Sequence, residues 1–216
     1  MILRYYGHSL FTVALSCGKI IAADPYYDFY QYPNRSLPVD ICTISHHHAD
    51  HDSINAFQKN PVIIDTAGVH FPFDGICITG IPTFHDDEGG IRRGNNLVFI
   101  LEAEGLRIVH LGDLGHPLSA EQISAIGKPD ILLLPVGGYY TINAQTALGV
   151  MQSLSPKVAI PMHYRTRACD DMPIAPLADF LQLTGASPQP MSLCRVTAED
   201  ISQRPSLLIM TTPEGD

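Results

Sequence analysis

Positive charge is scarce in this sequence, and long apolar runs are absent. Lys and Arg number 13 against 22 Asp and Glu, which gives a formal net charge of −9. Because binding to a phosphate backbone needs clustered Lys and Arg, this balance argues against a nucleic-acid-binding protein. No stretch approaches the roughly 18 uninterrupted apolar residues of a membrane-spanning helix. We therefore expect neither nucleic acid nor membrane as a partner.

Cysteine is also sparse. The five cysteines are an odd number, widely spaced and without a CxxC pair. This excludes a regular disulfide framework and a cysteine-cage zinc finger, and it suits small buried thiols in a reducing compartment. The first residues, "MILRYYGHSLF", carry a charge at Arg4 and do not resemble a signal peptide. These features predict a cytoplasmic protein.

The overall composition is that of a globular protein. Hydrophobic residues make up 45% of the 216 positions and charged residues 16%, enough to build a sizeable core. There is no linker, no low-complexity tract and no repeat of fixed period. We expect residues 1–216 to form a single domain.

The hydrophobic pattern changes along the chain. Strand-like segments dominate the first half, and strands alternate with helices in the second. Strands are predicted at 2–6, 11–15, 19–22, 39–45, 61–65, 75–84, 130–136 and 157–163, with a hairpin over 95–113. Helices are predicted at 119–127, 143–154 and 174–185. This order predicts an α+β fold with two sheets covered by helices on the outside.

The stretch "SHHHADH", residues 45–51, holds four of the ten histidines. His46, His48, Asp50 and His51 offer three imidazoles and a carboxylate, which are good ligands for first-row divalent metals. His46 and His48 alternate onto one side at the end of an extended segment, whereas Asp50 and His51 follow a turn. His47, between them, should point the other way. The stretch can therefore start two metal sites but complete neither.

The missing ligands should be single His or Asp residues at other strand ends. His85 in "IPTFHDD", Asp113 in "HLGDLG" and His163 in "IPMHY" meet this description. Asp113, with two oxygens, is suited to bridge two cations. We expect one ion at His46, His48, His85 and Asp113. The second ion is expected at the set Asp50, His51, Asp113 and His163.

These motifs, together with "YYGHS", "ADP" and "LPVGGYYTINAQTA", resemble the metallo-β-lactamase-fold hydrolases. The nearest branch is a compact one similar to ascorbate-6-phosphate lactonase. The resemblance extends over most of the chain and implies a four-layer αββα sandwich, with metals at one edge of the two sheets. It also implies the same seven ligands.

Two adjacent cations would make a bridging hydroxide available near neutral pH, which predicts hydrolysis of a small ester, lactone, amide or phosphodiester. Asp50 is the candidate catalytic residue, since it can orient the attacking water and move a proton. Zinc is the first choice of metal, with manganese and iron as alternatives, and no organic cofactor is needed. The expected partner is a small-molecule substrate, and a homo-oligomer is allowed.

The remaining polar residues leave alternatives open. His8 and Asp24 could hydrogen-bond to metal ligands, although Asp-Pro is also a common turn opener. The loop "GGIRRGNN", residues 89–96, could bind an anionic or polar substrate through Arg93 or Asn95, or could be a solvated hairpin loop. Arg92, Arg165 and Arg167 pose the same choice. His70, His110 and His116 are expected to be structural or remain ambiguous.

Two other function classes remain in competition. A di-iron redox protein on the same fold would need an electron-donor module that this chain lacks, and His48 disfavours it. A non-catalytic metal-binding protein would retain the fold without activity, although the complete ligand set argues against such decay.

Overall fold

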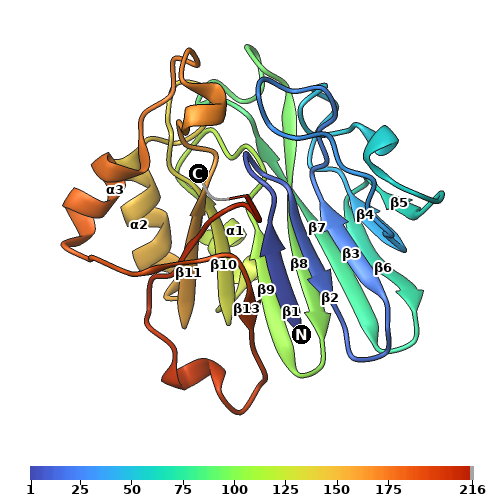
Figure 1. Ribbon diagram of the computed structural model, residues 1–216. Helices are drawn as coiled ribbons and strands as arrows, with labels where there is room; N and C mark the ends of the chain where they lie inside the picture. The colour runs from blue at the N-terminus through green and yellow to red at the C-terminus, as the bar shows by residue number, and fades with distance from the viewer. Residues whose placement is uncertain (215–216) are drawn as a thin grey trace.

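The protein folds as two six-stranded β-sheets packed face to face (Figure 1). The computed structural model describes residues 1–214. Both sheets are mixed, with antiparallel and parallel pairs. This arrangement confirms the predicted α+β sandwich.

The first sheet is built almost entirely from the N-terminal third of the chain. In spatial order its strands are β13 (Cys194–Arg195), β1 (Ile2–Tyr5), β2 (Phe11–Ala14), β3 (Ile20–Ala23), β4 (Ile41–Thr43) and β5 (Val62–Ile64). β1, β2 and β3 form an antiparallel meander, and β3, β4 and β5 are parallel. β1, β3 and β4 therefore run in the same direction.

The second sheet follows in the chain and lies behind the first in Figure 1. In spatial order its strands are β11 (Val158–Met162), β10 (Ile131–Pro135), β9 (Leu106–His110), β8 (Asn95–Ala103), β7 (Ile76–Phe84) and β6 (Gly68–Phe73). β9, β10 and β11 are parallel, and β7 runs with them because it is two antiparallel steps away from β9. The predicted hairpin is the β8–β9 pair.

Three α-helices occur in the described residues, and their ends follow local capping rules. They are α1 (Ala120–Ile126), α2 (Ala144–Leu154) and α3 (Leu177–Thr184). Ser119 caps α1 in a capping box with Gln122, and Asn143 caps α2. The last helix is shorter than predicted, because Pro176 occupies its N-cap in an extended conformation. None of these helices is long and apolar enough to cross a bilayer.

The remaining elements are short. They are three 3-10 turns, η1 (Ile54–Ala56), η2 (Arg167–Cys169) and η3 (Ile201–Gln203), and a parallel pair of two-residue strands, β12 (Pro190–Met191) and β14 (Ile209–Met210).

The apolar core has three parts. Inward-facing side chains of both sheets, such as Tyr5, Phe11 and Ile78, fill the space between them. The helices pack against the outer face of the second sheet through Ile126, Phe180 and similar residues. The outer face of the first sheet is covered differently from the prediction. Irregular segments near residues 26–39 and 168–174 cover it instead of α-helices.

Strand direction brings the polar loops together. The C-terminal ends of β1, β3 and β4 in one sheet, and of β7, β9 and β11 in the other, lead to the same end of the sandwich (top of Figure 1). Loops held on rigid sheets at such an end are where reactive side chains usually lie.

Candidate metal centre

One buried carboxylate lies among four imidazoles. Oδ2 of Asp113, directly after β9, is 3.2 Å from Nε2 of His163 and 3.3 Å from Nε2 of His85. The same oxygen is 3.4 Å from Nε2 of His51 and 4.0 Å from Nε2 of His46. These residues follow four different strands, so the fold brings together side chains separated by more than 100 positions in the chain.

The imidazoles form two groups around this oxygen. His46, His48 and His85, three of the ligands predicted for one ion, place one ring nitrogen each within 4.8 Å of one another. The second group has the same spacing but includes His8 together with His51 and His163. Oδ2 of Asp50 lies 3.6 Å from Nε2 of His51 and is hydrogen-bonded to Nε2 of His8 at 3.0 Å. His8 therefore contacts the second group directly.

Asp24 determines how two of the imidazoles are oriented. Its Oδ2 accepts hydrogen bonds from Nδ1 of His51 at 3.0 Å and from the Ser45 hydroxyl at 2.6 Å. Because the Ser45 proton is directed at Asp24, Nδ1 of His46, 2.9 Å from that hydroxyl, must donate to it. With both Nδ1 atoms acting as donors, Nε2 of His46 and of His51 face Asp113 as the atoms free to take a metal or a proton.

Hydrogen bonds with the Asn96 side chain fix the backbone next to Asp113. The side-chain oxygen of Asn96 accepts from the Asp113 amide at 2.9 Å, and its Nδ2 donates to the carbonyl oxygen of Leu111 at 3.0 Å. Gly112 adopts a left-handed conformation with φ of 55°. A Cβ there would lie 2.4 Å from the Asn96 oxygen and 2.6 Å from Cβ of Ser45. A glycine is therefore required next to Asp113.

For His51 and Asp113, burial and the charges of neighbouring groups shift the pKa in opposite directions, and the neighbouring charges dominate. Burial lowers the pKa of His46 to about 3, with His51 contributing. Burial would also lower the pKa of His51, but Asp113 and Asp24 outweigh it and hold the pKa well above its usual range. For Asp113, burial would raise the pKa, but His163 and His51 keep it well below normal. The carboxylate is thus ionised, and a protonated His51 partly neutralises it.

The donor set fits divalent cations. Nε2 of His46 and of His51 and Oδ1 of Asp113 are buried and find no hydrogen-bond partner among the described residues. Unpaired buried polar atoms are costly, so a group of them in one place needs an explanation. Imidazole nitrogens with a shared carboxylate are typical ligands of Zn, Mn and Fe, and a cation would replace the proton on His51.

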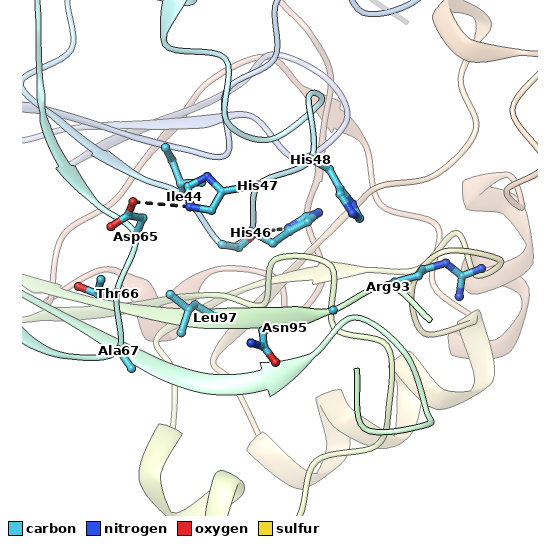
Figure 2. A pocket seen from close by; sticks show the side chains of 12 residues that line it. Ile44, His46, His47, His48, Asp65, Thr66, Ala67, Arg93, Asn95 and Leu97 are labelled. Atoms are coloured by element: carbon cyan, nitrogen blue, oxygen red, sulfur yellow. Dashed lines mark hydrogen bonds and ion pairs between the residues drawn. The ribbon is translucent and has the colours of Figure 1, made fainter. Parts of the chain in front are cut away.

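A cavity of about 420 Å³ opens onto the centre. His48, Asp50, His85, Asp113 and His163 form its polar part. Its apolar part comes from Phe29, Tyr30, Tyr140 and Met172. A second hollow of about 440 Å³ is lined by His46, His47, His48, Asp65 and Arg93, among others (Figure 2).

The neighbouring histidines are placed as follows. His47 points away from the centre in Figure 2, toward Asp65, with 3.6 Å between Nε2 and the carboxylate. His110 donates to the carbonyl of Ser9 and accepts from the Gly112 amide. His70 and His116 contact backbone atoms.

The polar residues left open by sequence are separated by the structure. Arg93 lines both the cavity over the centre and the second hollow. Asn95 lines the second hollow. Arg92 pairs with Glu88 on the surface, and Arg165 and Arg167 line a different depression, formed by Tyr164, Leu177 and neighbours.

Sequence reasoning missed several residues that support the centre. Ser45 and Asp86 carry no pattern of their own and are each adjacent to a predicted ligand, whereas Asn96 was considered only as part of the substrate-binding loop 89–96. Phe29 packs its ring 4.7 Å from that of His8. The signal available was adjacency to a ligand, which does not distinguish a buried hydrogen-bonding residue from an exposed one.

Comparison with known proteins identifies the relatives of this chain. A family described as "Beta-lactamase superfamily domain" matches residues 2–163. A UPF0173 metal-dependent hydrolase from Archaeoglobus fulgidus is 30% identical over 200 residues, covering 77% of this chain and 84% of the relative.

Solved structures agree with this result. A Thermotoga maritima protein described as a Zn-dependent hydrolase of the metallo-β-lactamase superfamily is 34% identical. It covers 97% of each chain with a TM-score of 0.79. Igni18, a metallo hydrolase from Ignicoccus hospitalis, is 25% identical with a TM-score of 0.68, covering 100% of this chain and 96% of its own. The chain therefore belongs to the metallo-β-lactamase superfamily and, within it, to the UPF0173 family of metal-dependent hydrolases.

Proposed function

We propose that this protein is a dinuclear metal-dependent hydrolase of small esters, lactones, amides or phosphodiesters. The observation that carries the proposal is the position of Asp113. One of its carboxylate oxygens, Oδ2, lies 3.2 to 4.0 Å from the Nε2 atoms of four histidines. A carboxylate at the centre of two histidine groups is suited to bridge two cations. The lactones are included because of the resemblance to ascorbate-6-phosphate lactonase.

Each ion would have its own set of ligands. His46, His48 and His85 would hold one ion and His51, His163 and Asp50 the other, with Asp113 shared. Zinc is the first candidate, with manganese or iron as alternatives. Bound cations supply Lewis acidity and lower the pKa of water from about 15.7 toward roughly 7, which makes hydroxide available at neutral pH.

The chain's own residues would supply orientation and proton transfer. Burial would raise the pKa of Asp50, but the hydrogen bond from His8 outweighs it and holds the pKa below its usual range. An ionised Asp50 beside the cavity can accept a proton from the attacking water and return it to the leaving group. His8 fixes the direction in which that carboxylate points.

Elemental analysis combined with a hydrolysis assay tests the proposal. Purified protein should turn over chromogenic esters or phosphodiesters, a chelator should abolish the activity, and Zn²⁺ or Mn²⁺ should restore it. Asp113→Ala should lose activity and at least one of the bound ions. Turnover that continues in the Asp113→Ala variant, or that resists metal removal, would reject this assignment.

A further inference from the structure

The cavity over the metal centre has an uneven distribution of charge. Its lining holds aromatic and thioether groups from Phe29, Tyr30, Tyr140 and Met172. Of all the residues that line it, Arg93 is the only Arg or Lys. A cavity with one apolar wall and one fixed cation selects for both shape and charge in its ligand.

The guanidinium of Arg93 is available to a ligand. Among the described residues it takes part in no ion pair, whereas Arg92, next to it, is paired with Glu88. The guanidinium carbon of Arg93 lies 5.5 Å from the centre of the Tyr140 ring, a cation–π contact that leaves its N–H donors unused. In Figure 2 the Arg93 side chain extends away from Asp65 and Thr66, which lie at the far end of the second hollow.

A buried carboxylate fixes the loop that carries Arg93. Oδ1 of Asp86 accepts from the amides of Glu88 and Gly90 at 2.9 and 2.8 Å. Its Oδ2 accepts from the amides of Arg92 and Arg93 at 2.9 and 2.8 Å. The loop is therefore ordered before any ligand binds, which reduces the entropic cost of binding.

We propose that Arg93 and the Tyr140 ring form an oxyanion-binding subsite, and that the substrate carries a carboxylate or phosphate group apart from the bond that is hydrolysed. A planar guanidinium binds such groups through paired N–H donors. The apolar body of the substrate would lie against Phe29, Tyr30 and Met172. This inference rests on the proposed hydrolytic function and narrows its substrates to small anions.

A matched pair of substrates tests the subsite on metal-loaded protein. The p-nitrophenyl esters of butyrate and of succinate share a leaving group, and the second replaces a methyl with a carboxylate. Arg93→Ala should lower kcat/KM for the succinate half-ester roughly 10- to 100-fold, the loss expected for a charge-assisted hydrogen bond. Its effect on the butyrate ester should stay within about threefold, below one such bond. Arg92→Ala, in the same loop, should affect neither ester by more than about twofold, as for an exposed ion pair.

Several measurements keep the result interpretable. Bound metal and Tm should match wild type in Arg93→Ala, and Arg93→Lys, which keeps the charge without the fork, should recover part of the loss. Equal effects of Arg93→Ala on both esters would overturn the subsite. So would an effect of Arg92→Ala as large as that of Arg93→Ala.

A binding experiment separates this inference from the hydrolytic proposal and distinguishes the two anions. Phenylacetate and phenylphosphonate are titrated calorimetrically into metal-loaded wild type, Arg92→Ala and Arg93→Ala. The anion whose affinity falls tenfold or more only in Arg93→Ala is the one that the subsite accepts. If wild type hydrolyses no ester but this pattern is found, the hydrolysis of esters is rejected and the subsite stands. If neither anion depends on Arg93, the subsite is rejected even when turnover is present.

Discussion

Asp24→Asn is the substitution that most sharply separates metal-ligand orientation from simple stability. The carboxylate accepts from the Ser45 amide through Oδ1, and from Nδ1 of His51 and the Ser45 hydroxyl through Oδ2. Burial would raise its pKa, but His110 and His51 hold the pKa below the usual range, so Asp24 is ionised. In the Asn variant the amide oxygen must stay on the Ser45 amide. An NH₂ group then faces Nδ1 of His51.

The consequence is a change of tautomer. Nδ1 of His51 would have to accept a hydrogen bond, which moves the proton to Nε2, the atom directed at Asp113. The Ser45 hydroxyl would lose its acceptor and could donate to Nδ1 of His46, which protonates Nε2 of that ring as well. One substitution thus disturbs a ligand of each proposed ion.

The magnitude follows from the same contacts. Loss of a group that orients a metal ligand typically lowers metal affinity about 10- to 100-fold, or about 1.4 to 2.8 kcal/mol for each ion. Loss of a charge-assisted buried hydrogen bond costs about 2 kcal/mol of folding free energy. For a chain of 216 residues this lowers the Tm of the metal-free protein by about 4 to 8 °C.

Competition with a chromogenic chelator measures the affinity, and scanning calorimetry of the metal-free protein measures the Tm. Asp65→Asn is the matched control, because that carboxylate also faces a histidine, His47, but outside the centre. The control should bind metal like wild type. Wild-type metal affinity in Asp24→Asn would refute the role assigned to Asp24, whatever happens to Tm.

Three further perturbations have defined outcomes. His8→Phe keeps an aromatic ring at this position but removes the donor to Asp50. Because Asp50 itself remains, kcat should fall about tenfold, less than the roughly 10²- to 10⁴-fold contribution of a complete acid–base group, while KM is unchanged. His116→Ala serves as the control, and equal kcat values for both variants would contradict the proposed role of His8. In Asp86→Asn, the side-chain amide cannot accept hydrogen bonds from all four loop amides. KM should therefore rise for anionic substrates only, and hydrogen exchange of the amides of residues 88–93 should become faster. An unchanged exchange rate would refute the role of Asp86 in ordering this loop. Removal of the metal by a chelator should lower Tm by about 5 to 10 °C for each bound ion, if the free metal had been present at about 100 times its Kd. A Tm that does not change with chelator would show that the ions do not stabilise the folded protein.

Regular elements were predictable wherever a local pattern was sufficient. The capped helices α1 and α2 and the β8–β9 hairpin agree with the predicted segments, because caps and turn residues act over a few positions. β6 (Gly68–Phe73) was missed. It is an edge strand that contains Pro72, which normally argues against a strand. The covering of the first sheet was also mispredicted, since irregular segments carry no periodic signal.

The candidate ligands could be selected from sequence because metal chemistry restricts residue types and because strand ends restrict positions. Their arrangement could not be deduced in the same way. That His8 contacts Asp50, and that Asn96 holds the backbone of Asp113, depends on distances between loops of different strands. The sequence also could not show which of the four arginines, Arg92, Arg93, Arg165 or Arg167, faces the cavity, because only the packing of the loops determines this.

The number of ions bound per chain tests the central claim most directly. Equilibrium dialysis against Zn²⁺ or Mn²⁺, followed by elemental analysis, should give two ions for wild type and at most one, weakly held, for Asp113→Ala. Wild-type protein that binds no ion, or an Asp113→Ala variant that retains two at wild-type affinity, would contradict a centre built around this carboxylate.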